Sequence, residues 1–187
     1  MNINDFSVSH VEGKARTGLL KTSKGYIETP VFMPVGTAAT VKAMTPETLE
    51  TIGSQVLLCN TYHLMIRPGE QVVNHLGGLN KFMNWPGPIL TDSGGFQVMS
   101  LAKLRQLNED GVTFRSHIDG KKFLLTPEES IRIQETLKST IIMAFDECTS
   151  FPVEKNMADI SMKLSSRWAE RSKSSFKGLN GSMIFGI

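Results

Sequence analysis

This chain is organised around ten residues, Pro88-Ile89-Leu90-Thr91-Asp92-Ser93-Gly94-Gly95-Phe96-Gln97. The apolar run from Pro88 to Leu90 predicts a buried strand, and polar residues, two glycines and an aromatic follow it at once. Adjacent glycines permit unusual φ angles and let backbone N–H groups approach a ligand, while Phe96 offers a flat face for stacking. The segment therefore predicts a strand end that binds a planar, hydrogen-bonding ligand. The alternative is a strand followed by a glycine turn with a solvated Asp92.

The same pattern recurs along the chain. Apolar runs at Gln55–Cys59 and Thr140–Phe145 each predict a strand and lead into Asn60-Thr61 and Asp146-Glu147. Further strands are expected at Pro30–Gly36, which is bracketed by prolines, and at Met183–Ile187. Helices are expected between them, from caps, N1 prolines and terminal glycines, over 46–52, 70–76, 127–138 and 154–176, the last with Ile160, Leu164, Trp168 and Ala169 on one face.

Alternation of strands and helices predicts an α/β fold with a parallel sheet, and polar residues at successive strand ends predict one shared rim. A (βα)8 TIM-barrel type fits best, truncated after about four to five βα units, as one domain over residues 1–187. An N-terminal hairpin or irregular segment is expected over 2–27. A helix is expected from Phe96 through Leu107, followed by an inserted hairpin over 111–125 around Asp119-Gly120.

Composition places the chain among globular proteins. It has 187 residues, 40% hydrophobic, with a net charge of +2, so any RNA-binding site must be local. No apolar run approaches the roughly 18 residues of a membrane span, and the first residues lack a signal-peptide pattern, which predicts a cytoplasmic protein. Cys59 and Cys148 belong to no C-x-x-C pair and are expected to be buried thiols.

Asp92 and Asp146 are expected to share a pocket at the rim. Paired carboxylates suit acid/base catalysis, glycosyl transfer, divalent metal binding, or recognition of a ligand with paired N–H donors, and their spacing does not choose among these. The alternative is that one carboxylate caps a helix while the other forms an ion pair.

Other charged residues predict less chemistry. The histidines have no partner at metal-site spacing and are expected to be surface or satisfied residues, with His63 closest to the rim; they are His10, His63, His75 and His117. A basic stripe on the late helix could contact phosphates but more simply forms a solvated face; it comprises Arg167, Arg171, Lys173 and Lys177.

Four motifs in order carry a resemblance to a known family. They are Phe32-Met33-Pro34-Val35-Gly36-Thr37, Asn60-Thr61-Tyr62-His63-Leu64, Leu90-Thr91-Asp92-Ser93-Gly94-Gly95-Phe96-Gln97 and Phe145-Asp146-Glu147-Cys148, with Phe185-Gly186-Ile187 at the end. Together they closely resemble the bacterial tRNA-guanine transglycosylases (queuine tRNA-ribosyltransferases), over nearly all of this chain and about half of such an enzyme.

The resemblance implies roles for named residues. That family exchanges guanine at the tRNA wobble position for a queuine-type base, which must leave the stack to reach the pocket. Asp92 matches the family's proton acceptor and substrate contact, and the base-binding positions are matched by Ser93, Gly94, Gly95, Phe96, Asp146 and Cys148. Phe96 matches the stacking aromatic, and Asp146 the carboxylate that accepts hydrogen bonds from the base. Asn60 and Thr61 match a supporting loop.

The resemblance also implies what these residues lack. The family's nucleophilic aspartate and its Cys3His zinc site fall outside the matched half, so no cofactor is expected in this chain and it is expected to be inactive alone. The expected partners are tRNA, through its anticodon loop, a guanine or queuine-type base, and a homodimer mate or a second chain that completes the barrel. Two alternatives stay open: a non-catalytic fragment that binds tRNA or an intact transglycosylase, and a barrel glycosidase that uses Asp92 and Asp146.

Overall fold

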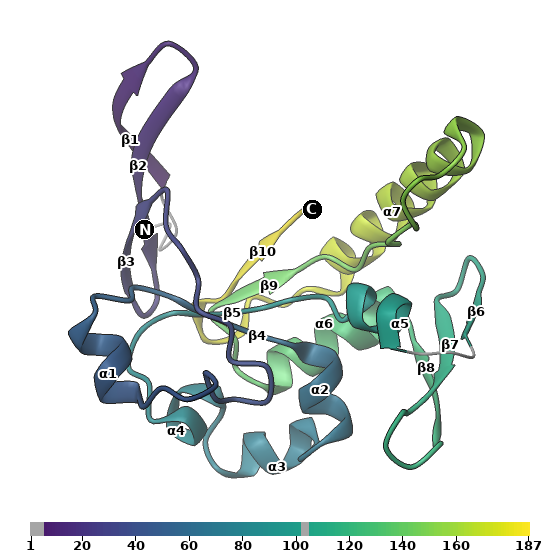
Figure 1. The fold of residues 1–187 in the computed structure, drawn as a ribbon, viewed down its shortest axis with the longest axis horizontal. Helices are drawn as coiled ribbons and strands as arrows, with labels where there is room; N and C mark the ends of the chain where they lie inside the picture. The colour runs from purple at the N-terminus through teal and green to yellow at the C-terminus, as the bar shows by residue number, and fades with distance from the viewer. Residues whose placement is uncertain (1–5, 102–104) are drawn as a thin grey trace.

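The computed structural model describes residues 6–101 and 105–187 (Figure 1). The chain opens with an antiparallel sheet of β1 (Phe6–Glu12), β2 (Ala15–Thr22) and β3 (Gly25–Thr29). The expected N-terminal hairpin is therefore present, with a third strand added to it. Its base is anchored by Leu20 and Ile27, which are buried against the central sheet, whereas β1 is exposed along its length.

The central sheet is parallel and follows the order β4-β5-β9-β10. Its strands are β4 (Leu57–Cys59), β5 (Ile89–Thr91), β9 (Ile141–Met143) and β10 (Met183–Phe185). Four strands expected from the apolar runs are thus confirmed, and each strand lies beside the next one of the sheet in chain order. Within the described residues this sheet is open, with β10 at one edge.

The segment 30–36 is not the buried strand that its apolar run predicts. It joins the β4 edge by one bridge, in which the Pro34 carbonyl accepts from Leu58 N–H and Gly36 N–H donates to the Leu58 carbonyl at 2.6 Å. Pro30 and Pro34 have no N–H to donate, which prevents a regular ladder. Phe32 is 81% exposed. The prediction of a buried strand over 30–36 is therefore wrong.

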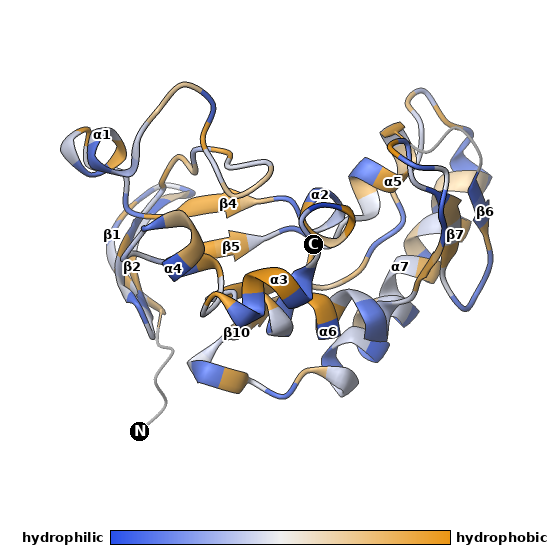
Figure 2. Ribbon diagram, turned by 90° about the horizontal axis from the view of Figure 1, so that it is seen from below, coloured by the Kyte–Doolittle hydropathy of each residue, from blue (hydrophilic) through white to orange (hydrophobic). Residues whose placement is uncertain are grey.

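Helices cover one face of the central sheet (Figures 1 and 2). They are α1 (Pro46–Thr51), α2 (Thr61–Ile66), α3 (Glu70–His75), α4 (Leu79–Met83), α5 (Gly95–Leu101), α6 (Pro127–Thr136) and α7 (Lys155–Ser175). The short 3-10 helix η1 (Leu179–Gly181) lies instead close to Ser23, in the turn between β2 and β3. The expected helices at α1, α3, α6 and α7 are confirmed. Thr45 and Thr126 cap α1 and α6 as predicted, since each side chain accepts from a backbone N–H three residues on. The helices α2 and α4 were not predicted.

The insertion after β5 is a second antiparallel sheet rather than a single hairpin. It consists of β6 (Arg105–Leu107), β7 (Val112–Arg115) and β8 (Lys122–Leu125). The predicted hairpin over 111–125 is confirmed, but the helix expected through Leu107 ends at Leu101, and its next three residues lie outside the described ranges. Pairing with β7 makes Arg105–Leu107 a strand.

The structure of the long helix α7 differs from the prediction in the exposure of Ile160 and in the partners of the basic stripe. Leu164 and Trp168 are buried as expected, but Ile160 is 50% exposed. Arg167 and Arg171 form ion pairs with Glu109 and Glu128, so at least these two members of the basic stripe bind protein carboxylates. In the described part of the chain, no helix has the length and apolar character to cross a membrane.

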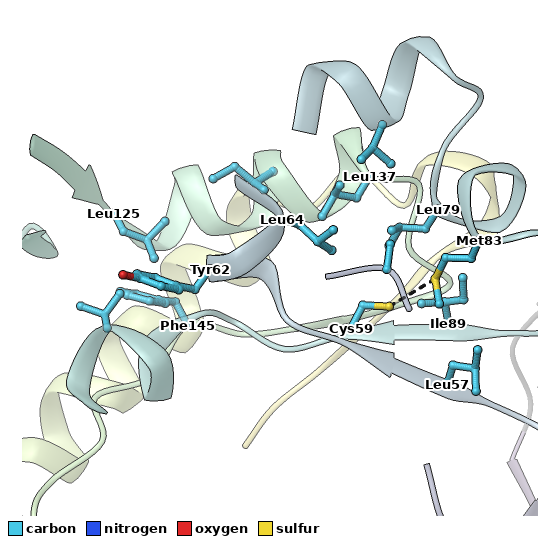
Figure 3. Close-up of a cluster of buried hydrophobic side chains, with 14 of the residues drawn as sticks. Leu57, Cys59, Tyr62, Leu64, Leu79, Met83, Ile89, Leu125, Leu137 and Phe145 are labelled. Atoms are coloured by element: carbon cyan, nitrogen blue, oxygen red, sulfur yellow. Dashed lines mark hydrogen bonds between the residues drawn. The ribbon is translucent and has the colours of Figure 1, made fainter. Parts of the chain in front are cut away.

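Two apolar clusters lie on the two faces of the central sheet. Leu57 and Ile89 belong to the larger cluster beneath the helices, where the Cys59 thiol contacts the Met83 sulfur at 3.4 Å (Figure 3). Leu90 and Ile141 belong to the smaller cluster with the N-terminal sheet. Consequently both faces of the short strands are apolar, and the polar residues gather where the strands end.

Candidate functional site

Three strand ends meet at one edge of the central sheet. Asn60 and Thr61 follow β4, Asp92 and Ser93 follow β5, and Asp146 is the third residue after the end of β9. Because these strands are parallel neighbours, their carboxyl ends lie on the same side. The hydrogen bonds described below join all three ends, so the structure brings these sequence-predicted residues together.

Asp92 is held by the end of β4. One carboxylate oxygen accepts from the Asn60 side-chain amide, the other accepts from the Thr61 N–H at 2.9 Å, and the Thr61 hydroxyl donates to the Asp92 carbonyl at 2.6 Å. Burial raises the pKa of Asp92 above its ordinary value, while the hydrogen bonds from Asn60 and Thr61 act in the opposite direction. The result is an oriented carboxylate with increased proton affinity.

Asp146 is oriented by two neighbours. Ser93 hydroxyl donates to one carboxylate oxygen at 2.9 Å, and the Cys148 thiol donates to the other at 3.4 Å. Burial, followed by the Asp146 charge, raises the pKa of Cys148 to about 12, which keeps the thiol protonated as a donor. A carboxylate offers about four lone-pair positions, so this arrangement leaves acceptor capacity at Asp146 for a ligand.

The two glycines of the β5 loop serve different purposes. Gly94 has a φ of +86°, a conformation that side chains rarely adopt. A Cβ at Gly95 would lie 2.6 Å from the Asp146 carbonyl oxygen, so a side chain there would force the two strand ends apart. Phe96 follows on the first turn of α5 and is 57% exposed, which leaves its ring free for stacking.

Buried polar side chains of α6 form hydrogen bonds with the backbone at the ends of β5 and β9. Ser130 hydroxyl donates to the Ser93 carbonyl at 2.7 Å, and the Gln134 amide both donates to the Met143 carbonyl and accepts from the Met143 N–H. Ser130 and Gln134 are fully buried. Sequence reasoning missed these residues, although polar side chains on the otherwise apolar face of a helix were the available signal.

Helix α7 supports the β9 end in the same way. Ser172 hydroxyl accepts from the Phe145 N–H at 3.1 Å, and Ser165 hydroxyl accepts from the Glu147 N–H at 2.9 Å. The Phe145 ring stacks on Trp168 with centroids 4.9 Å apart. Asp146 therefore lies between two residues whose backbones are fixed by α7.

A cluster of aromatic rings lies beside the rim. The Tyr62 hydroxyl is 2.9 Å from His117 Nδ1, and the His63 and His117 ring centroids are 6.1 Å apart. Burial, then the neighbouring His117, lowers the pKa of His63, whereas Asp92 acts to raise it. The prediction that the histidines are surface residues or have hydrogen-bond partners is confirmed for His117. The contact of His63 with this cluster, through its edge-on packing against Tyr62 at 5.3 Å, was not foreseen.

The space behind the rim is small. A cavity of about 20 Å³ touches Gly95, Asp146 and Cys148, which is too little for more than a water molecule. Gln97, whose side chain also helps to lower the pKa of Asp92, has a buried Oε1 atom with no partner among the described residues. The space behind the rim therefore has no room for a planar ligand.

Comparisons with known proteins agree on one family. The family model described as queuine tRNA-ribosyltransferase matches residues 11–187. Similar curated proteins, each named queuine tRNA-ribosyltransferase, come from Jannaschia sp. (strain CCS1), 59% identical, Ruegeria sp. (strain TM1040), 58% identical, and Rickettsia bellii (strain RML369-C), 57% identical. The alignments cover 97–98% of this chain and 49%, 49% and 51% of these relatives, so the chain spans about half their length.

Proposed function

Because the chain belongs to the queuine tRNA-ribosyltransferase family, we propose that its rim is the base-recognition side of a tRNA-guanine transglycosylase. The proposed architecture is part of one (βα)8-type catalytic barrel over residues 1–187. It is supported by four parallel strands that lie side by side in chain order, with helices on one face. Family membership also favours this function over a barrel glycosidase.

The observation that carries the proposal is the oriented Asp146 carboxylate, which lies against Gly95 in the loop that leads into the exposed Phe96. Ser93 and Cys148 each donate to one of its oxygens, and Phe96 offers a stacking face. Guanine has adjacent N–H donors, at N1 and the exocyclic amine. The two oxygens of an ionised carboxylate such as Asp146 can accept both. Gly94 and Gly95 would let the backbone of the loop approach the plane of the base.

Asp92 is proposed as the proton acceptor. Asn60 and Thr61 hold its two carboxylate oxygens, and burial raises the pKa of Asp92, which favours transient protonation as a base exchanges its proton. Asn60 and Thr61 are thus supporting residues rather than participants in the chemistry.

The proposed substrates are tRNA and a guanine or queuine-type base, with the target nucleotide extruded from the anticodon loop. The covalent step belongs, by the resemblance, to an aspartate that is not among these 187 residues. We therefore propose base recognition without exchange for these residues taken alone, with a homodimer mate or a second polypeptide as partner. These 187 residues include two cysteines, too few for a Cys3His zinc site.

Equilibrium dialysis with radiolabelled guanine and adenine tests this function. Adenine has no N–H at N1 and no 2-amino group, so it loses at least one charged hydrogen bond to Asp146. Such a bond is worth about 1.5–3 kcal/mol, and guanine should therefore bind roughly 10- to 150-fold more tightly. Equal affinity for the two bases, or no saturable guanine binding, would contradict the proposal.

A further inference from the structure

One buried polar atom beside the rim is not explained by the packing of the fold. Gln97 is the third residue of α5, and its side-chain oxygen Oε1 is buried without a hydrogen-bond partner among residues 6–101 and 105–187. A buried carbonyl oxygen that lacks a donor costs stability. Methionine has nearly the same length and would cover the same surface without that cost, so packing alone does not account for a glutamine at this position.

The Gln97 amide acts on the Asp92 carboxylate. Burial raises the pKa of Asp92, and the hydrogen-bond donors that oppose this rise are, in decreasing order, the Asn60 side chain, the Thr61 N–H, the Gln97 side chain and the Gly94 N–H. The reversed amide would place Oε1, an acceptor, against the acceptor oxygens of the carboxylate. The amide therefore directs its NH2 group toward Asp92 and leaves Oε1 on the side that has no donor.

Gln97 acts on Asp92 from a different element than the two donors that rank above it. Asn60 and Thr61 belong to the end of β4. Gln97 belongs to α5, where it directly follows the exposed Phe96. The helix that carries the stacking ring of the proposed base site thus also restrains its proton acceptor.

The other titratable groups near Asp92 come from β4, α2 and the end of β9. Burial, followed by the Asp92 charge, raises the pKa of the Cys59 thiol to about 12, so this thiol stays neutral. Burial lowers the pKa of His63, which favours its neutral form, and Asp146 is bound by Ser93, the residue after Asp92. Within residues 6–101 and 105–187, no salt bridge involves Asp92. Neutral donors therefore stabilise its ionised form.

We propose that Gln97 is a positioning residue, whose amide holds the ionised Asp92 carboxylate from the α5 side and so sets the pH range in which Asp92 accepts a proton. The unpartnered Oε1 atom is a consequence of this role, because turning the amide to satisfy the oxygen would remove the donor from Asp92. This inference rests on the proposed function, in which Asp92 is the proton acceptor.

Carbon-13 NMR of the chain, labelled at the aspartate side-chain carboxyl carbon, measures the titration of Asp92 directly. Its signal is identified by its loss in Asp92→Asn. Gln97→Met keeps the length of the side chain and removes both polar atoms. Gln97→Glu keeps the shape and replaces the donor by an acidic oxygen, so it still decides the question if the methionine variant does not fold. The matched control is Gln71→Met, at an exposed position of α3, and circular dichroism verifies each fold.

A donor to a carboxylate favours the ionised form, so its removal should raise the pH midpoint of the Asp92 titration. The expected rise is about one pH unit in Gln97→Met, and more in Gln97→Glu, where a second carboxylate adds like-charge repulsion. The control Gln71→Met should stay within about 0.2 unit of the wild type. A midpoint that is unchanged or lowered in both Gln97 variants overturns the inference.

Guanine binding tests whether Gln97 acts through Asp92. In equilibrium dialysis at pH 7, Gln97→Met should weaken guanine binding by roughly 5- to 20-fold in the wild-type background and by less than about twofold in Asp92→Asn. Equal losses in the two backgrounds would show that Gln97 acts on the base or on the fold instead, and would overturn the inference. Absence of guanine binding by the wild type would refute the proposed function, whereas the Asp92 titration needs no base and would stand.

Discussion

Asp146→Asn tests the base site at its most specific contact. The carboxylate accepts from Ser93 on one oxygen and from Cys148 on the other, and each oxygen keeps acceptor capacity for guanine. The substitution replaces one acceptor by an amide donor that faces an N–H of the base. Losing a charged hydrogen bond and opposing two donors costs about 2–4 kcal/mol, which predicts guanine binding weaker by roughly 30- to 1000-fold.

Hypoxanthine isolates the contribution of one hydrogen bond, because it is guanine without the exocyclic amine. The wild type should prefer guanine over hypoxanthine by about 10- to 150-fold, and Asp146→Asn should reduce that preference to within about threefold. Equilibrium dialysis with each labelled base measures both affinities. Glu50→Gln, the same acid-to-amide change at an exposed position of α1, serves as the control. An unchanged guanine affinity, or an intact preference in the variant, would refute the assignment of Asp146.

Three further outcomes follow from the same contacts. Because burial raises the pKa of Asp92 above its ordinary value of 3.8, ionisation of this carboxyl costs stability, so the wild type should gain stability relative to Asp92→Asn as the pH falls from neutrality toward 3.8. The difference between the two melting temperatures should level off below pH 3.8, where the wild-type carboxyl is protonated in both states, and a pH-independent difference would refute this expectation. Thr126→Ala removes the acceptor for the Glu129 N–H and should cost about 1 kcal/mol in urea unfolding, whereas Thr136→Ala should cost less than half of that. The Cys148 thiol, with its pKa raised from 9.0 to about 12, should react with iodoacetamide at pH 8 roughly 1000-fold more slowly than in denatured protein, and rapid native labelling would contradict this.

Local patterns predicted the elements that carry the site. Short apolar runs ended in polar residues at β4, β5 and β9, and threonine–proline pairs marked the starts of α1 and α6. These signals work because capping and burial act over a few residues. Parallel pairing then follows from the alternation of strands and helices, so the meeting of Asp92 with Asn60 could be expected before any coordinates.

The errors arose where distant contacts decide the conformation. The 30–36 segment is apolar, but its prolines limit it to one bridge with Leu58. Arg105–Leu107 has no strong strand propensity and becomes a strand through pairing with β7. Ser130 and Gln134 read as ordinary helix residues, although their buried side chains bind the β5 loop and β9. Such roles depend on partners far away in the sequence.

Base exchange tests most directly whether the rim is the base-recognition side of a transglycosylase. The chain is incubated with tRNA and radiolabelled guanine, alone and together with a polypeptide that carries the remaining half of one of the curated relatives, and label is counted in acid-precipitable RNA. These 187 residues alone should incorporate no guanine. The combined polypeptides should incorporate it, and Asp92→Asn or Asp146→Asn in this chain should abolish that incorporation. Incorporation by the chain alone would place the nucleophile among these residues, and incorporation unaffected by either substitution would contradict the proposed base site.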